Sequence, residues 1–198
     1  MHIKLEELLK QHAGKLISGQ ITRRITAKEG QDFVTTALVL LPKAMVNGCI
    51  DHNALAEEKL TALPDNDRYT KEGDIVIKLS TPYDSVIVTK EDEGLLVTSF
   101  CAIIRGLDPD TARYLIAYLN STEFNALAKA STSGSIVIVL ALSFLKECLI
   151  PLPPLDEMKK IGDEYARILE LKRTFDDVYS LSRKKIDLTI AKIAKEVK

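Results

Sequence analysis

Histidine side chains, which carry much of the metal and acid–base chemistry of proteins, are few in this chain. His2, His12 and His52 lie in the first quarter of the sequence without a paired spacing, and no His-Glu-x-x-His motif occurs. His52 follows Asp51, but no Ser or Cys nucleophile is marked out beside this pair. We therefore expect no metal site, no cofactor and no catalytic residue.

The three cysteines, Cys49, Cys101 and Cys148, form no Cys-x-x-Cys pair. We expect them to be small buried side chains in a reducing compartment. The N-terminus lacks the layout of a signal peptide, and no apolar stretch is long enough to span a bilayer. The sequence therefore predicts a cytoplasmic protein without a membrane partner.

Nucleotide chemistry has no support either. No glycine-rich loop ends in Gly-Lys-Ser/Thr, and no Gly-x-Gly-x-x-Gly occurs. Ser80-Thr81-Pro82-Tyr83 is superficially similar to the Asn/Asp-Pro-Pro-Tyr/Phe motif of DNA adenine methyltransferases, whose aromatic ring stacks on a flipped base. Thr81 stands where that motif has an acid or amide, and only one proline is present. We therefore expect a turn between two strands, with Pro82 at its second position.

The composition is that of a soluble globular protein, with 46% hydrophobic and 28% charged residues among 198. This length suffices for one domain and an appendage. The net charge is −1, so a nucleic-acid-binding surface must be local or supplied by a partner. Residues 155–198 carry 11 Lys and Arg against 9 Asp and Glu, a net charge of +2, which leaves −3 for residues 1–154.

Residues 1–150 are expected to form a β-rich α+β domain. Asn47-Gly48 predicts a turn with a return strand at Cys49-Ile50, and residues 55–63 suit a helical turn or an extended linker. Pro109 begins a predicted helix, and a shorter helix follows at 124–130. Apolar, β-branched runs predict further strands, the third to fifth of them as a meander: 3–10 (strand or helix), 33–41, 75–79, 85–89, 95–105 and 136–140.

A linker, Pro151-Leu152-Pro153-Pro154, precedes a long predicted helix that begins at Leu155. Apolar and small residues recur there at alternating steps of three and four, which is typical of a coiled-coil seam, with defects at Lys172 and Ser182. The expected dimer or partner residues are Met158, Ile161, Tyr165, Ile168, Phe175, Tyr179, Ile186 and Ile193.

Such a helix of about 40 residues is roughly 60 Å long. One small domain cannot cover both of its sides, so we expect it to pack on another helix, in trans or from a second copy. A helical hairpin broken near Thr174-Phe175 or Ser180 is the alternative.

Five landmarks occur in an order that resembles one known family. They are the strand Gly73-Asp74-Ile75-Val76-Ile77, the strand Thr98 to Ile104, the helix Tyr114 to Ser121 ending in Leu-Asn-Ser, the loop Ser133-Gly134-Ser135, and Leu145 to Leu155 ending in Pro-Leu-Pro-Pro-Leu. Over residues 70–198 the chain thus resembles the DNA specificity (S) subunits of type I restriction–modification systems. It departs from them where the apolar run Ile136-Val137-Ile138-Val139 follows the Gly-Ser loop.

The resemblance implies a non-catalytic, half-length subunit. Members of the family carry two target recognition domains and two long helices that pair antiparallel, whereas this chain has one of each. The resemblance thus implies a target recognition domain at 1–150, a linker and dimerisation or partner helix at 151–198, and two copies that together read a split, palindromic duplex. Methyltransferase and restriction subunits would supply the chemistry.

Candidate DNA contacts are Lys and Arg for phosphates and small polar side chains on loops for bases. They are Arg23, Arg24, Lys43, Lys78, Ser80, Thr81, Tyr83, Lys129, Ser131, Thr132, Ser133 and Ser135. Three other functions stay open: a coiled-coil scaffold whose head binds protein, an inactive remnant of a specificity subunit, and a small hydrolase or transferase that depends on His52.

Overall fold

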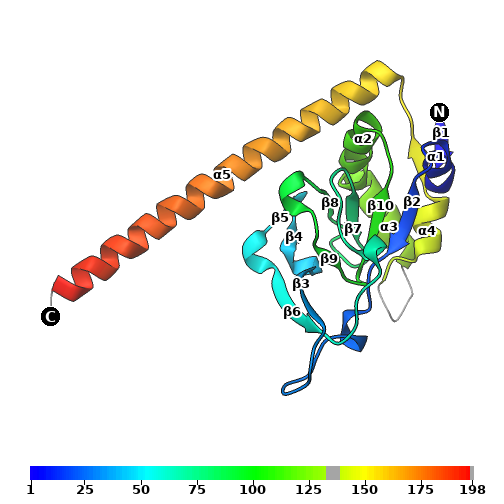
Figure 1. The fold of residues 1–198 in the computed structure, drawn as a ribbon. Helices are drawn as coiled ribbons and strands as arrows, with labels where there is room; N and C mark the ends of the chain where they lie inside the picture. The colour runs from blue at the N-terminus through cyan, green and yellow to red at the C-terminus, as the bar shows by residue number, and fades with distance from the viewer. Residues whose placement is uncertain (133–138, 197–198) are drawn as a thin grey trace.

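A four-stranded antiparallel sheet, in the order β2-β10-β7-β8, forms the centre of the head (Figure 1). The computed structural model describes residues 1–132 and 139–196. The sheet strands are β2 (Lys15–Ser18), β7 (Ile75–Lys78), β8 (Ser85–Ile87) and β10 (Cys101–Arg105). Strand β7 reads as a continuous apolar run because both of its faces are buried: Ile75 and Ile77 face one core, and Val76 faces another.

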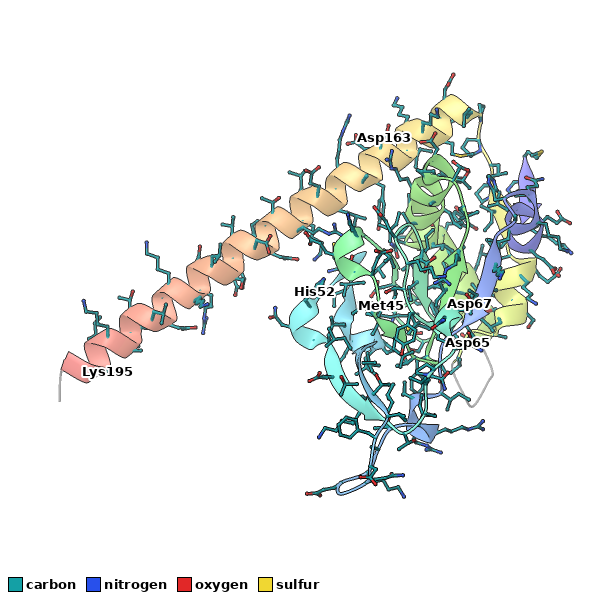
Figure 2. All side chains as sticks on the ribbon, in the orientation of Figure 1. Met45, His52, Asp65, Asp67, Asp163 and Lys195 are labelled. Atoms are coloured by element: carbon teal, nitrogen blue, oxygen red, sulfur yellow. The ribbon has the colours of Figure 1, made fainter. Side chains whose placement is uncertain are left out.

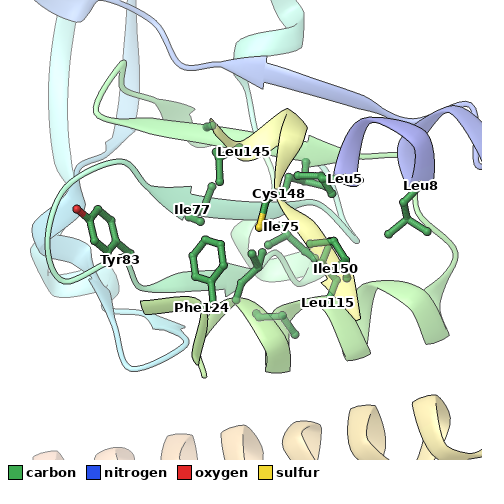
Figure 3. Close-up of a cluster of buried hydrophobic side chains, with 14 of the residues drawn as sticks. Leu5, Leu8, Ile75, Ile77, Tyr83, Leu115, Phe124, Leu145, Cys148 and Ile150 are labelled. Carbon is green, nitrogen blue, oxygen red and sulfur yellow. The ribbon is translucent and has the colours of Figure 1, made fainter. Parts of the chain in front are cut away.

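Helices cover one face of this sheet, and Figure 3 shows their apolar side chains meeting those of β7. These helices are α1 (Leu5–Gln11), α2 (Pro109–Leu119), α3 (Thr122–Thr132) and α4 (Leu142–Glu147). Strands β1 (His2–Lys4) and β11 (Leu149–Pro151) pair antiparallel and join the N-terminus to the end of the head. Pro151 thus belongs to a strand rather than to the linker in which we expected it.

A second sheet, in the order β6-β3-β9, packs on the other face. It consists of β3 (Thr35–Leu40), β6 (Ala56–Leu60) and β9 (Leu96–Val97), and β3 pairs with β9 in parallel. Strands β4 (Met45–Val46) and β5 (Cys49–Ile50) form the hairpin that Asn47-Gly48 predicted. Short 3₁₀ turns connect the strands: η1 (Thr22–Arg24), η2 (Pro42–Ala44), η3 (His52–Ala54), η4 (Asn66–Arg68) and η5 (Lys90–Asp92).

Helix α5 (Leu155–Glu196) is a single helix of 42 residues that leaves the head at one end (Figure 1). Its length is therefore about 63 Å at 1.5 Å per residue. The long helix and the α+β class are confirmed, and the alternative of a broken hairpin is wrong. The three cysteines are buried and free, as we expected.

The predictions for two segments need correction. Residues 95–105 form β9 and β10 in different sheets, because a turn that Cys101 N closes on Thr98 O at 2.9 Å separates them. A simple meander is therefore wrong for this region. Residues 55–63 contain strand β6 rather than a helical turn or linker. The strand expected at 136–140 lies mostly outside the described residues, and residues 139 and 140 are not in a strand.

Candidate nucleic-acid interface and partner helix

Helix α5 docks on α2 through its first turns, and Gly162 sits at a close approach of the two helices. A Cβ atom at Gly162 would lie 2.9 Å from Cβ of Arg113 and 3.1 Å from the next backbone nitrogen. Salt bridges flank this point, from Arg113 to Asp163 at 3.0 Å and from Lys159 to Asp110 at 3.2 Å. The residue that opposes helix formation in the sequence is therefore required by the packing of α5.

Asn120, at the end of α2, joins three elements with one side chain. Its Oδ1 accepts a hydrogen bond from Ser85 N at 2.8 Å. Its Nδ2 donates to Ser85 O at 2.9 Å and to the Tyr165 hydroxyl at 2.8 Å. Burial raises the pKa of Tyr165, so this phenol stays neutral and can accept the bond. Strand β8, α2 and α5 are thereby held in one arrangement.

The turn of the β4–β5 hairpin provides a second support for α5. Gly48 has a φ of +80°, and a Cβ there would lie 2.6 Å from Cδ2 of Leu169. Leu169, at 6% exposure, is the last buried residue within 155–195, the part of α5 whose burial the structure describes. Every residue from Arg173 to Lys195 is exposed, and Lys195 lies far from the head, whereas Asp163 lies on the docked part (Figure 2). We call residues 173–195 the arm.

The head takes up only part of the predicted coiled-coil seam. Met158 and Tyr165 pack against the helical side of the head, whereas Ile161 and Ile168 are 39% and 53% exposed. The seam residues in the arm are all exposed: Phe175, Tyr179, Ile186 and Ile193. The head of this chain leaves these six side chains exposed.

Three predicted DNA contacts are corrected because their side chains are buried. Lys78 is 7% exposed, and its Nζ lies 2.8 Å from Oδ2 of Asp84. Tyr83 is fully buried in the helical core (Figure 3), where its hydroxyl shares a hydrogen bond of 3.1 Å with Thr132, which is also buried. These groups stabilise the head and cannot reach a duplex in this structure.

The other described candidates lie at the surface. Ser80 is half-buried, and Ser131 is exposed with its hydroxyl donating to Ala128 O at 2.8 Å. The remaining exposed ones are Arg23, Arg24, Lys43, Thr81 and Lys129. Ser133 and Ser135 lie outside the described residues. The surface candidates come from four separate elements: η1, η2, the β7–β8 turn and α3.

The Gly-Asp landmark has a structural explanation. Gly73 adopts a φ of +82°, which favours glycine, at the turn before β7. Asp74 is 1% exposed and accepts two hydrogen bonds from Arg105 of β10, from Nε at 2.8 Å and from Nη2 at 2.6 Å. This bidentate carboxylate raises the pKa of Arg105. Asp74 and Arg105 thus lock two central strands together and are not available for chemistry.

His52, the only histidine considered for catalysis, lies on η3 with its Nε2 2.8 Å from Oδ1 of Asp92. Asp92 is itself held by Thr89, whose backbone N–H and hydroxyl donate to it at 3.0 and 2.6 Å. No hydrogen bond among the described residues links His52 to a Ser or Cys side chain, and that part of the chain contains no cluster of three potential metal ligands. The pair connects two surface turns.

Sequence reasoning did not single out Asn120 or Gly162 for the positions that they hold. The only signals were the Leu-Asn-Ser landmark and a lone glycine in a helix, and neither shows what a side chain contacts.

Solved structures share this fold. A chain from work on complex assembly and conformational transition of a type I restriction–modification system matches with a TM-score of 0.62 and 17% identity. It covers 100% of this chain and 49% of that chain. The HsdS subunit from Thermoanaerobacter tengcongensis matches with a TM-score of 0.54 and 16% identity, over 86% of this chain and 37% of that chain.

The chain has the fold of an HsdS subunit, in a form with one domain. It spans less than half the length of either HsdS-like structure. No protein-family model and no curated protein matches the sequence. Among the described residues, no helix is long and apolar enough to cross a membrane. The HsdS fold of this chain therefore comprises one head and one long helix.

Proposed function

We propose that this chain is a half-length, non-catalytic DNA specificity subunit of a type I restriction–modification system. The observation that carries the proposal is the HsdS fold, which extends over the whole chain and includes the long helix. The head recognises duplex DNA, and α5 binds other subunits. Methyltransferase and restriction subunits supply the chemistry, and the complex works in the cytoplasm, where its DNA is.

The surface candidates divide into two roles for DNA binding. Arg23, Arg24, Lys43 and Lys129 contact phosphates, because their charges attract the backbone whatever its sequence. Thr81 and Ser131, with Ser80, Ser133 and Ser135, contact base edges or phosphates from loops and helix ends.

A second copy of this chain covers the exposed seam of α5. At 100° per residue, Met158, Gly162, Tyr165 and Leu169 form the face that meets the head. The exposed seam residues form a stripe beside that face: Ile161, Ile168, Phe175, Tyr179, Ile186 and Ile193. The head therefore leaves this stripe open to a second helix.

One antiparallel register suits this stripe. If the two-fold axis passes through residue 177, Ile161 meets Ile193, Ile168 meets Ile186, and Phe175 meets Tyr179. The seam defects Lys172 and Ser182 then meet each other. Shifting by one heptad places Lys172 against Phe175 in one direction and Tyr179 against Ser182 in the other. In the favoured register, Glu164 also comes beside Lys192 of the second helix, at positions where opposite charges stabilise a coiled coil.

The arm has a second apolar face for a methyltransferase subunit. Leu181 and Leu188 are 68% and 63% exposed and lie seven residues apart, well away from the seam stripe. Lys184 and Lys185 lie on either side of them. An acidic amphipathic helix of the modification subunit fits such a face, because its carboxylates would meet these lysines.

Duplex binding tests the function directly. The wild-type chain, alone and with a type I methyltransferase subunit, is incubated with a random duplex library, and bound sequences are selected. We expect a split palindromic site and an affinity that falls steeply with salt. Arg23→Gln/Arg24→Gln should weaken binding and reduce the salt dependence, whereas Lys78→Gln, at a buried position, should act only through stability. Failure to bind any duplex in either state would overturn the proposal.

A scaffold without DNA binding is the second candidate, and the exposed seam favours it. It predicts the same dimer with no duplex affinity, as does an inactive remnant of a specificity subunit. The library selection separates both from a DNA-reading subunit.

A further inference from the structure

A basic cleft lies along β2, the edge strand of the central sheet. Its cations come from four elements: Lys10 of α1, Lys15 of β2, Arg68 of η4 and Lys146 of α4. Among the described residues that line it, Glu6 carries the single carboxylate. Elements α1, β2 and α4 lie together on the side of the head away from the arm (Figure 1).

The charge of this cleft contrasts with that of the whole chain. Four cations and one carboxylate give the lining a net charge of +3, whereas the complete chain carries −1. Asp67, which η4 places beside Lys15, reduces the local sum to +2. The positive charge that a DNA-binding head of this composition must concentrate locally is therefore present here.

Two of the lysines are held only weakly by protein carboxylates. Lys10 Nζ lies 3.4 Å from Oε1 of Glu6, and Lys15 Nζ lies 3.8 Å from Oδ2 of Asp67. The two lysine side chains are 71% and 66% exposed. Exposed pairs of this kind contribute about 0–1 kcal/mol. A phosphate can therefore replace these carboxylates at little cost.

Arg68 is positioned differently. Its Nη1 donates to the Ser18 hydroxyl at 2.6 Å and to the Ser18 carbonyl oxygen, so its guanidinium is fixed against β2. The cleft thus combines one oriented cation with three long, adaptable ones. This combination suits a row of phosphates, which need charge along a line more than they need exact geometry.

We propose that this cleft binds the sugar–phosphate backbone of duplex DNA outside the recognition loops. It adds affinity that does not depend on sequence and helps to orient the head on the duplex. The proposal rests on the proposed function, because it assigns a second DNA contact to the same head.

A neutralised variant tests the cleft. Lys10→Gln/Lys15→Gln/Lys146→Gln removes its exposed lysines and leaves Arg68 in place. The matched control, Lys71→Gln/Lys90→Gln/Lys160→Gln, removes three exposed lysines elsewhere. Duplex affinity is measured by fluorescence anisotropy at several salt concentrations, on the selected site and on an unrelated duplex, after thermal melts confirm that both variants fold.

The cleft variant should lose the same factor of affinity on both duplexes. Its plot of log affinity against log salt should become shallower by about 2 to 3 units, roughly 0.9 for each lost phosphate contact. The control should keep the wild-type slope. If the cleft variant binds duplex as tightly as the wild type, this inference is overturned, and the proposed function is unaffected.

Two other outcomes also decide against the cleft as a DNA site. A wild-type chain that binds no duplex overturns the proposed function and this inference with it. If the cleft variant loses binding to poly-glutamate but keeps binding to duplex, the cleft binds an acidic protein instead of DNA.

Discussion

At the scale of single residues, Asn120 joins distant parts of the chain, because its amide contacts both a strand and the long helix. Neutral hydrogen bonds contribute about 0.5–1.5 kcal/mol each, so Asn120→Ala should lower the free energy of unfolding by about 2–3 kcal/mol. Tyr165→Phe removes one of its three bonds and should cost about 1 kcal/mol. Urea denaturation followed by circular dichroism measures both.

Asn125 offers a matched control for this change. Among the described residues its Nδ2 donates to Ser121 O alone, within its own region of the chain, at 3.0 Å. Asn125→Ala should therefore cost less than half as much as Asn120→Ala. Equal losses would show that Asn120 has no special role in joining α5 to the head.

The carboxyl group of Asp108 should make the free energy of unfolding depend on pH. Partial burial acts to raise its pKa, but hydrogen bonds from Thr111 and from the N–H of Asp110 outweigh this effect and hold the pKa below its ordinary value of 3.8. Its carboxylate therefore stabilises the fold fully above that value, and this contribution is lost as the pH falls through the lowered pKa.

Asp108→Asn keeps a good helix cap and removes the titration. The free-energy difference between the wild type and this variant should be constant from pH 5 to 7 and shrink below about pH 4. His12 Nδ1 lies 3.3 Å from Oδ2 of Asp108, so both proteins are also measured with His12→Gln. A difference that grows towards low pH would contradict the assignment.

At the scale of elements, Gly162 decides how α5 meets α2. In an isolated helix, Gly→Ala stabilises by about 1 kcal/mol. Here the added Cβ would lie 2.9 Å from Cβ of Arg113, which is not the flexible end of a side chain, so the helices must move apart. Gly162→Ala should therefore destabilise the protein and speed proteolysis of α5.

Ala166, one turn later and exposed, is the reference position. Ala166→Gly should cost about 1 kcal/mol through helix propensity alone, without changing the docking of α5. A stabilising effect of Gly162→Ala would contradict the close approach of α5 and α2 at this position. Thermal melts and timed proteolysis of both variants supply the comparison.

Elements with a strong local signal were predictable from the sequence, whereas the pairing of strands was predictable only within hairpins such as β4–β5. Strand β7 was clear because it is buried on both faces and thus begins with the apolar run Ile75-Val76-Ile77. Strand β6, Ala-Glu-Glu-Lys-Leu, is polar because it has one exposed face, and its pattern did not reveal a strand. The break between β9 and β10 was missed because the turn there has neither Gly nor Pro.

The candidate site was predictable only in outline. Lys78 and Tyr83 have side chains that suit DNA contacts, but their type does not show that Asp84 and Thr132 satisfy them inside the head. The spacing of apolar residues predicted the seam of α5. Which seam residues the head buries and which stay exposed depends on where Gly48 and α2 lie. The burial of a side chain depends on residues that are distant in the sequence, and a local sequence pattern does not reveal those residues.

At the scale of the whole molecule, the open stripe of α5 determines the assembly that we propose. The antiparallel register places Ile168 of one copy against Ile186 of the other. A charge at this position would be buried without a partner, at a cost of about 3 kcal/mol or more, which weakens the dimer about a hundredfold or more. Ile168→Glu should therefore be monomeric at concentrations where the wild type has twice the chain mass by light scattering.

Rescue by a second substitution tests the register itself. Ile168→Glu/Ile186→Lys places opposite charges across the two-fold axis twice and should restore the dimer. Ile168→Glu/Ile193→Lys, which suits the register shifted by one heptad, should not. Thr174→Glu, away from the seam stripe by helical geometry, is the control and should stay dimeric. If Ile193→Lys instead restores the dimer of Ile168→Glu, the two-fold axis lies half a heptad away from residue 177. The distance between the two heads then differs, and so does the spacing of the two halves of the DNA site.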